Sequence, residues 1–153
     1  MNPIGVVICN YNKKDFVLQC VQSVLESKEK NFDIYVVDNA SSDGSAEALK
    51  KAYGNQITVI ENKENLGGYG GFNTGLRIVR DKGYSYFMCL DDDAAVDENA
   101  LSVLYHYMEE HTDTGMAGCR VYHTQMPDYI QQSGLLIDFD NCTAKTIGAD
   151  MLE

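Results

Sequence analysis

Three consecutive aspartates stand at the end of an apolar segment. Asp91, Asp92 and Asp93 directly follow residues 84–90 (YSYFMCL). Two carboxylates about 4 Å apart repel by roughly 4 kcal/mol at an effective dielectric constant near 20. An acidic turn avoids this cost when its side chains spread into water, whereas a cluster that points at one place needs a cation.

The spacing of these aspartates suits a divalent cation. Side chains alternate along an extended segment, so we expect Asp91 and Asp93 on one side and Asp92 on the other. Mg²⁺ or Mn²⁺ usually takes one or two protein carboxylates and completes its octahedron with water and substrate phosphate. The alternative is an acidic turn that caps the next helix. Asp97 is already a good N-cap for that helix, so we favour a metal site at Asp91 and Asp93.

Asp38 ends another apolar segment, residues 32–37 (FDIYVV), and begins the polar turn 38–45 (DNASSDGS). A carboxylate at this position can accept a hydrogen bond from an imide N–H, such as that of uracil, or from a ribose hydroxyl. The alternative is an Asx-turn, in which the side chain accepts a hydrogen bond from its own backbone. The sequence leaves both interpretations open.

Residues 65–73 (NLGGYGGFN) hold four glycines between two asparagines. Glycine permits positive φ and lets a ligand approach the backbone closely. The helix that follows offers unpaired N–H groups to phosphate or sugar oxygens. A dinucleotide fingerprint matches poorly, because Asn73 occupies the position of its third glycine. The other alternative is a flexible surface loop, which two flanking asparagines make less attractive.

Strands and helices alternate around these motifs. Short apolar runs predict strands, and apolar residues at helical spacing predict helices. The pattern predicts an α/β sandwich on a mostly parallel sheet. The expected strands are residues 5–9, 32–37, 57–60, 84–90, 115–122 and 130–137, the last as a strand or the opening of a hairpin. The expected helices are residues 16–27, 46–53, one that ends near Lys82 before Gly83, and one that follows Asp97.

The polar segments all follow predicted strands. In open α/β sheets, ligands bind beyond the carboxyl ends of the strands. We therefore expect four segments to gather at one edge of the sheet and form a ligand site: NYNK at 10–13, DNASSDGS at 38–45, NKENLGGYGG at 62–71 and DDDAAVD at 91–97.

Composition excludes some partners. The 153 residues include 12 basic and 23 acidic side chains, for a formal net charge of −11. This balance argues against binding to nucleic acid or to an anionic membrane. A phosphorylated ligand stays compatible, because a divalent ion reverses the local field. The longest apolar runs have the length of strands, so we predict no membrane span and no secretion signal.

The cysteines predict a reducing compartment. Their number is odd and no CxxC pair occurs, so a disulfide framework or a zinc site is not expected. We predict a cytoplasmic protein with five buried, non-catalytic free thiols: Cys9, Cys20, Cys89, Cys119 and Cys142.

Four segments in this order, VVICNYNK, VVDNASSDGS, ENLGGYGGFNTGL and FMCLDDDA, resemble family 2 glycosyltransferases of the GT-A fold. They are most similar to the rhamnosyl- and galactofuranosyl-transferase-like branch, in which a DDD form of the DxD motif follows an NxGxxGG loop. The resemblance spans residues 5 to 95. It implies one Rossmann-like GT-A domain over residues 1–153, with a nucleotide-sugar-binding half at 1–122 and the start of an acceptor-side region at 123–153.

The resemblance also implies site residues and a reaction. A nucleotide-diphosphate sugar, UDP- or dTDP-linked, would transfer its sugar with inversion to a glycan or lipid-linked hydroxyl acceptor, in the synthesis of a cell-surface polysaccharide. Asp91 and Asp93 would hold Mn²⁺ or Mg²⁺ on the diphosphate, and Asp92 would lie beside the sugar, which gives Asp92 and Asp93 catalytic roles. The remaining contacts to the nucleotide and donor would come from Asn10, Tyr11, Asp38, Asn65, Gly67, Gly70, Gly71, Asn73 and Asp91.

Such domains normally continue into an acceptor-binding half that supplies a carboxylate base. Asp138 and Asp140 are the candidates for this base between Tyr122 and Glu153. We expect a donor-binding piece of a longer enzyme, which alone binds a sugar nucleotide without transferring the sugar. A non-catalytic binding module is the first alternative. A phosphotransferase of the haloacid dehalogenase type is the second, and ranks lower because its nucleophilic aspartate follows the first strand.

Overall fold

The computed structural model describes residues 3–148 and 151–152. The chain forms two compact units, which divide between Leu101 and Ser102. The predicted division into a nucleotide-sugar-binding half at 1–122 and an acceptor-side region at 123–153 concerns function and stays a prediction.

The first unit alternates strands and helices in the predicted order. All strands and helices expected up to Asp91 are present, with ends that differ by a few residues. They are β1 (Ile4–Asn10), α1 (Lys14–Leu25), β2 (Phe32–Asp38), α2 (Ser45–Tyr53), the 3-10 helix η1 (Gly54–Gln56), β3 (Ile57–Glu61), α3 (Gly67–Lys82) and β4 (Tyr86–Asp91).

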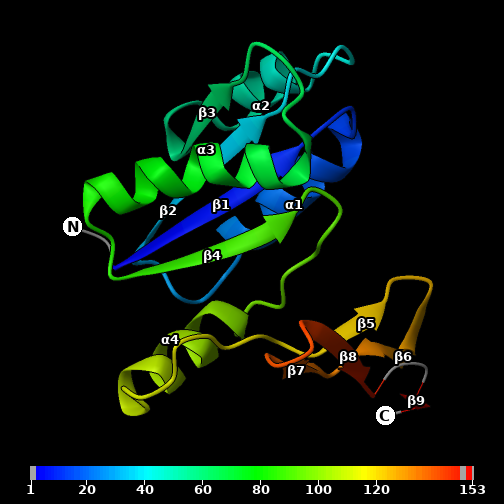
Figure 1. Ribbon diagram of the computed structural model, residues 1–153. Helices are drawn as coiled ribbons and strands as arrows, with labels where there is room; N and C mark the ends of the chain where they lie inside the picture. Colours follow the sequence, from blue (N-terminus) through cyan, green and yellow to red (C-terminus); the bar gives the residue numbers. More distant parts are fainter. Residues whose placement is uncertain (1–2, 149–150, 153) are drawn as a thin grey trace. The chain divides into compact units, whose positions relative to one another are not determined.

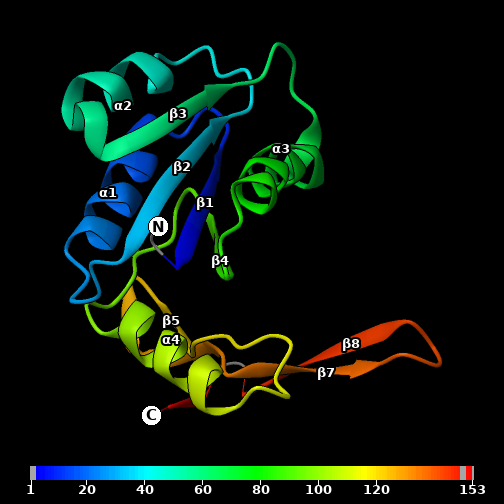
Figure 2. The same cartoon turned by 90° about the vertical axis from the view of Figure 1, so that its left-hand side faces the viewer.

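The four strands form one parallel sheet in the order β3-β2-β1-β4. Their arrowheads point the same way (Figure 1), so the loops after them leave from one edge. Figure 2 shows α1 and α2 on one face of the sheet and α3 on the other. The predicted sandwich, with a parallel central sheet between helices, is confirmed.

The core lies where β1 and β2 are covered on both faces. Val6, Val7 and Ile8 are each 0% exposed. Fully burying such a side chain contributes about 1.5–3 kcal/mol. On the α3 face, a Cβ at Gly75 would lie 2.4 Å from Cγ1 of Val7 and 3.1 Å from Cγ2 of Val37. Glycine at position 75 therefore allows α3 to pack directly on the two central strands.

Polar contacts fix the C-terminal end of α3. Gly83 ends the helix with φ of 78°, as predicted. The Tyr84 hydroxyl donates to Asp33 Oδ2 at 2.6 Å, and the hydroxyl oxygens of Tyr84 and Tyr35 lie 2.7 Å apart. Since Asp33 and Tyr35 belong to β2, this cluster joins the end of α3 to the sheet.

The strand β4 is less buried than its sequence predicts. It is the last strand of the sheet, and alternate residues face outward: Phe87 is 62% exposed and Cys89 is also exposed. The register pairs Phe87 with Gly5 and Cys89 with Val7, so both lie on the face that α3 covers over β1. An edge position therefore explains why this apolar run is only half-buried.

The prediction that all five cysteines lie in the core is wrong for three of them. Cys20 is buried and Cys9 is half-buried, whereas Cys89, Cys119 and Cys142 are exposed. All five are free thiols, as predicted. Apolar neighbours in the sequence did not indicate burial here, because Cys89 lies on an edge strand and Cys142 lies in a turn between strands.

The second unit contains most of the helix α4 (Ala100–Glu110) and small antiparallel sheets. The strands β5, β6 and β9 form one, and β7 and β8 form a hairpin. The strand expected at 115–122 is wrong over most of its length, because residues 115–120 have no regular structure and hold two glycines, which disfavour strands. The expected segment 130–137 does open a hairpin. The elements are α4 (Ala100–Glu110), which begins in the first unit, β5 (Val121–His123), β6 (Met126–Gln132), β7 (Gly134–Asp138), β8 (Thr143–Ile147) and β9 (Met151–Leu152).

Among the helices of the described residues, the longest is α3, with 16 residues. None of them combines the length and the apolar character that crossing a bilayer requires.

Candidate functional site

Buried polar side chains join the loops that follow β1 and β2. Asn10, at the end of β1, donates from Nδ2 to Asp38 Oδ1 at 2.9 Å and to Ser41 Oγ at 3.1 Å. Asn10 is 0% exposed and Asp38 is 3% exposed. The backbone N–H of Asn12 also donates to Ser41 Oγ, at 3.0 Å. The predicted site residues Asn10 and Asp38 therefore lie side by side.

Asp38 also shapes its own turn. Its Oδ2 accepts a hydrogen bond from the backbone N–H of Ser41 at 3.0 Å. The structural alternative, in which the side chain closes a turn of its own backbone, is therefore present. An ionised carboxylate has about four lone-pair sites, so these two hydrogen bonds leave acceptor capacity. A contact between Asp38 and a base stays a prediction.

Asn39 connects the turn after β2 with the glycine segment. Its Nδ2 donates to Asn65 Oδ1 at 2.8 Å and to the carbonyl oxygen of Gly67 at 3.1 Å. Its Oδ1 accepts from Asn62 Nδ2 at 2.9 Å and from the N–H of Leu66 at 3.1 Å. We did not single out Asn39 from the sequence, although a buried asparagine beside Asp38 is a polar group that requires partners.

The glycine segment is helical where the sequence indicates a loop. The helix α3 begins at Gly67, whose φ of 70° sets the entry, so the flexible-loop alternative is wrong. The side chain of Asn65 accepts the N–H of Gly67 at 2.8 Å. A Cβ at Gly71 would lie 2.3 Å from Cys9 Sγ. Packing against β1 therefore explains Gly71 without a ligand. Asn73 is exposed on α3.

The acidic turn is built differently from the predicted alternation. The strand β4 ends at Asp91, and a turn begins there, because Ala94 N–H donates to the Asp91 carbonyl oxygen at 3.2 Å. Asp92 and Asp93 consequently form ion pairs with the same ammonium group. Lys13 Nζ is 3.1 Å from Asp92 Oδ1 and 2.7 Å from Asp93 Oδ2. The expectation that Asp92 points away from Asp93 is wrong, because the chain is no longer extended.

The loop after β1 thus contacts the acidic turn as well. Tyr11 N–H donates to Asp92 Oδ2 at 3.2 Å, and the Tyr11 ring is 46% exposed. Asp92 is 7% exposed, whereas Asp91 and Asp93 are exposed. With Asn10 and Asn39 bonded to the other loops, all four polar segments meet at one edge, which confirms the predicted convergence. We did not predict Lys13 as a site residue, because the sequence does not show that its side chain contacts Asp92 and Asp93.

Residues 5–146 match the family model described as Glycosyl transferase family 2. The chain belongs to glycosyl transferase family 2. A curated relative is the teichoic acid poly(glycerol phosphate) polymerase of Staphylococcus epidermidis, 27% identical over 146 residues. The match covers 92% of this chain and 19% of the relative. The finer resemblance to the rhamnosyl- and galactofuranosyl-transferase-like branch is not confirmed by these matches.

Solved glycosyltransferases share the fold. The mannosyltransferase PcManGT of Pyrobaculum calidifontis, in complex with GDP-Man and Mn²⁺, aligns with a TM-score of 0.65 at 19% identity, over 80% of this chain and 36% of that one. The S. aureus TarS fragment 1–349, in complex with UDP-GlcNAc, aligns with a TM-score of 0.63 at 18% identity, over 80% of this chain and 41% of that one. The family 2 domain therefore has the predicted GT-A fold.

The family implies a divalent cation, and the exposed carboxylates fit one. Among the described residues, no three His, Cys, Asp or Glu side chains are grouped closely enough to hold a metal alone. Mg²⁺ and Mn²⁺ sites commonly use only one or two protein carboxylates, with diphosphate and water as the other ligands. The carboxylates of Asp91 and Asp93 are hard donors at the open edge and meet this requirement.

The Lys13 ammonium favours the ionised form of Asp93. The Lys13 ammonium, through its hydrogen bond, holds the pKa of the Asp93 carboxyl below its usual value. Hydrogen bonds to Asp93 and then to Asp92 raise the pKa of Lys13. The Asp93 carboxyl is therefore charged at neutral pH, as a cation ligand must be.

The thiols of Cys9 and Cys20, near the acidic turn, favour the protonated form. Burial, followed by the charge of Asp92, raises the pKa of Cys9 to about 11 and that of Cys20 to about 12. Only the thiolate is a good nucleophile. Cys9 and Cys20 are therefore protonated at neutral pH, and the non-catalytic role of the five cysteines stays a prediction.

The candidates for a general base lie in the second unit. Asp138 Oδ1 accepts the N–H groups of Asp140 and Asn141 at 3.0 and 3.1 Å, and its Oδ2 accepts Asn141 Nδ2 at 2.8 Å. These hydrogen bonds, with that of the Asn141 side chain the largest cause, hold the pKa of Asp138 below its usual value. Asp138 thus has a structural role in the turn between β7 and β8.

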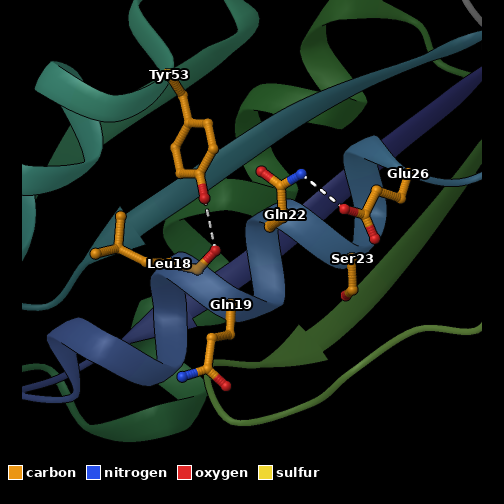
Figure 3. Close-up of a pocket in the computed structure, with 6 residues that line it drawn as sticks. All are labelled: Leu18, Gln19, Gln22, Ser23, Glu26 and Tyr53. Atoms are coloured by element: carbon orange, nitrogen blue, oxygen red, sulfur yellow. Dashed lines mark hydrogen bonds between the residues drawn. The ribbon is translucent and has the colours of Figure 1, made fainter.

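A shallow groove between α1 and α2 lies apart from the predicted site residues. Figure 3 shows that Tyr53 reaches from α2 to α1, where its hydroxyl donates to the carbonyl oxygen of Leu18 at 2.7 Å. None of the residues that line the groove is a predicted site residue. The groove is lined by Leu18, Gln19, Gln22, Ser23, Glu26 and Tyr53.

Proposed function

We propose that residues 5–146 form the donor-binding part of an inverting glycosyltransferase. It transfers a sugar from a nucleotide-diphosphate donor to a hydroxyl acceptor during synthesis of a cell-surface glycan. The observation that supports this proposal most directly is the convergence of four polar segments on one edge of the sheet. Hydrogen bonds of buried polar side chains join these segments to one another. The side chains are those of Asn10, Asp38, Asn39 and Asp92. Structures with the same fold hold GDP-Man with Mn²⁺ or UDP-GlcNAc, which supports a nucleotide sugar as the ligand.

The residues of this edge suit the parts of such a donor. Asp38 accepts an N–H of the base, beside the exposed ring of Tyr11. Asn65, Gly67 and Gly70, with Asn73 further along α3, lie near the ribose and the sugar. A UDP- or dTDP-linked donor suits Asp38, because uracil and thymine each carry an imide N–H that a carboxylate accepts.

Asp91 and Asp93 would hold Mn²⁺ or Mg²⁺ at the diphosphate. When bound, the cation supplies Lewis-acid stabilisation of the negative charge that develops on the leaving diphosphate. Asp92 fixes the backbone of Tyr11 from its buried position and, with Asp93, completes the acidic turn beside the sugar. An acceptor hydroxyl attacks from the opposite face of the sugar, and a carboxylate base removes its proton.

Binding without transfer is the second candidate function. It is favoured by the role of Asp138, whose carboxylate organises the turn between β7 and β8. A donor-hydrolysis assay with UDP-sugars separates the two functions, because a binding domain takes up the donor and leaves it intact.

Calorimetry with UDP, dTDP and GDP, each with Mn²⁺, tests the proposed site. Wild-type protein is expected to bind at least one of these nucleotides in a metal-dependent manner. Asp91→Asn and Asp93→Asn should each weaken binding at least tenfold, since each removes a charged ligand of the metal. Asp81→Asn, on the exposed end of α3, makes the same change of charge and should bind like wild type. Absence of nucleotide uptake by wild type, or unaltered binding by both variants, would contradict the proposal.

A further inference from the structure

Lys13 is anchored through its backbone, and its ammonium lies on a partly exposed side chain. The carbonyl oxygen of Lys13 accepts the N–H of Val17 at 2.9 Å, which ties the residue to the first turn of α1. Its side chain is 44% exposed and makes no cap hydrogen bond to the helix. A lysine ammonium is a compact charge on a flexible four-carbon stem. The group can therefore change partners while the loop around it stays in place.

The two carboxylates that share this ammonium differ in freedom. The side chain of Asp92 is 9% exposed and also accepts the N–H of Tyr11. The side chain of Asp93 is 50% exposed. Asp92 is thus fixed by the fold, whereas Asp93 can turn toward a ligand at the open edge.

Lys13 and a divalent cation compete for Asp93. The ammonium lies 2.7 Å from Asp93 Oδ2, and a cation bound to the same carboxylate would place like charges a few ångströms apart, which is unfavourable. A donor diphosphate brings negative oxygens to this edge together with the cation. Ammonium–phosphate hydrogen bonds are charge-assisted and strong, so the diphosphate offers Lys13 a replacement partner.

We propose that Lys13 is a positioning residue that exchanges partners during donor binding. In the donor-free protein its single positive charge is shared between Asp92 and Asp93. When a divalent cation takes Asp93, the ammonium moves to the donor's diphosphate. The inference rests on the proposed function. It predicts that removal of the Lys13 ammonium strengthens the binding of metal alone and weakens the binding of nucleotide in the presence of metal.

Binding of Mn²⁺ and of UDP to Lys13→Met tests the exchange. Free Mn²⁺ is measured by electron paramagnetic resonance, and UDP binding by calorimetry at saturating Mn²⁺. Without nucleotide, the variant should bind Mn²⁺ about two- to fivefold more tightly, because one partly exposed ion pair no longer competes. With Mn²⁺ present, it should bind UDP about tenfold more weakly, because a charge-assisted hydrogen bond to phosphate is lost.

Two further variants control for charge and folding. Lys14→Met removes the same charge from the neighbouring residue, whose ammonium lies 3.4 Å from the carbonyl oxygen of Asp43, and it should change neither affinity more than about twofold. Lys13→Arg keeps a cation on a long stem and should bind Mn²⁺ and UDP within about threefold of wild type. Lys13→Arg remains informative if Lys13→Met fails to fold.

Opposite effects of Lys13→Met support the exchange. Weaker binding of both Mn²⁺ and UDP shows a merely structural role and overturns it, as do two unchanged affinities. If Lys13→Met does not fold, Lys13→Arg binding UDP at least tenfold more weakly than wild type also overturns the exchange. Failure of the proposed function looks different, because then wild-type protein itself takes up no nucleotide with Mn²⁺.

Discussion

Asn10 joins the loops that follow β1 and β2, on the side of the edge proposed to bind the nucleotide. Its buried Nδ2 supplies hydrogen bonds to both Asp38 and Ser41. Its buried Oδ1 has no hydrogen-bond partner among the described residues. A buried polar atom without a partner costs about 1–3 kcal/mol. The Asn10 side chain is therefore held in place by the hydrogen bonds that its Nδ2 donates to Asp38 and Ser41, and not by its Oδ1.

Asn10→Ala should lower the free energy of unfolding by about 2–3 kcal/mol, because the buried Asp38 carboxylate loses a donor. Urea denaturation measures this change. Asn55→Ala, at an exposed asparagine of η1, should change stability by less than about 0.5 kcal/mol. Equal stability of the two variants would mean that the Asn10–Asp38 hydrogen bond does not hold the edge together.

At the scale of single elements, α3 packs closely on the sheet because two of its glycines have no side chain. The helix packs against β1 and β2 through Gly71 and Gly75, whose Cβ positions are taken by Cys9 and Val7. The same helix begins at the edge where the polar loops meet, with its entry held by Asn39 and Asn65. Close packing therefore accounts for Gly71 and Gly75, whereas ligand contacts at Gly67 and Gly70 stay a prediction.

Gly71→Ala should cost about 1–3 kcal/mol of stability, because its Cβ would overlap Cys9 Sγ and force the helix outward. Gly68→Ala, where no atom lies within 4 Å, should be neutral or stabilise by up to about 1 kcal/mol. Thermal or urea unfolding compares the two. The double variant Gly71→Ala with Cys9→Ala should recover part of the loss, and no recovery would contradict the packing explanation.

Asp43 links the first turns of two helices. Its Oδ2 accepts the N–H of Lys14 at the start of α1 at 2.9 Å, and its Oδ1 accepts the N–H of Ser45 at the start of α2 at 3.0 Å. Burial raises the pKa of this carboxyl, but the hydrogen bonds from Ser45 and Lys14 outweigh burial and hold it below its usual value. The charged form is therefore the one that stabilises the fold.

Asp43→Ala should cost about 1–2 kcal/mol at pH 7, as for the loss of a helix N-cap. Because the folded pKa is depressed, the stabilisation by Asp43 is complete above the unfolded pKa, near 4, and is lost as the pH falls through the folded value. Urea denaturation at pH 7 and pH 3 should show a larger difference between wild type and variant at pH 7. A difference that is the same at both pH values would contradict this role.

The sequence predicts elements better than it predicts the neighbours of each side chain. The apolar runs predicted β1 and β2, and Gly83 predicted the end of α3. These predictions succeeded because each signal lies within the element that it describes or next to it. The exposure of Phe87 depends on β4 being an edge strand, which sequence spacing does not reveal. Likewise, the ion pairs of Lys13 with Asp92 and Asp93 join residues that lie far apart in the chain. For the site, the four segments and their shared edge were predictable, but the turn at Asp92 was not.

At the scale of the whole molecule, charge decides which ligands the chain can accept. A formal net charge of −11 repels anions in general. At the edge of the sheet, Lys13 is a local counter-charge to the acidic turn, and the proposed divalent cation would bind at Asp91 and Asp93. We therefore expect an anionic donor to bind only together with that cation, and nucleotide binding should be lost in the presence of a chelator.

A crystal structure with Mn²⁺ and UDP tests the central claim most directly. Anomalous scattering locates Mn²⁺ independently of the nucleotide. We predict an anomalous peak between the diphosphate and the carboxylates of Asp91 and Asp93, with the base beside Asp38. Nucleotide bound away from this edge of the sheet, or a manganese peak without a ligand from the acidic turn, would contradict the proposed site.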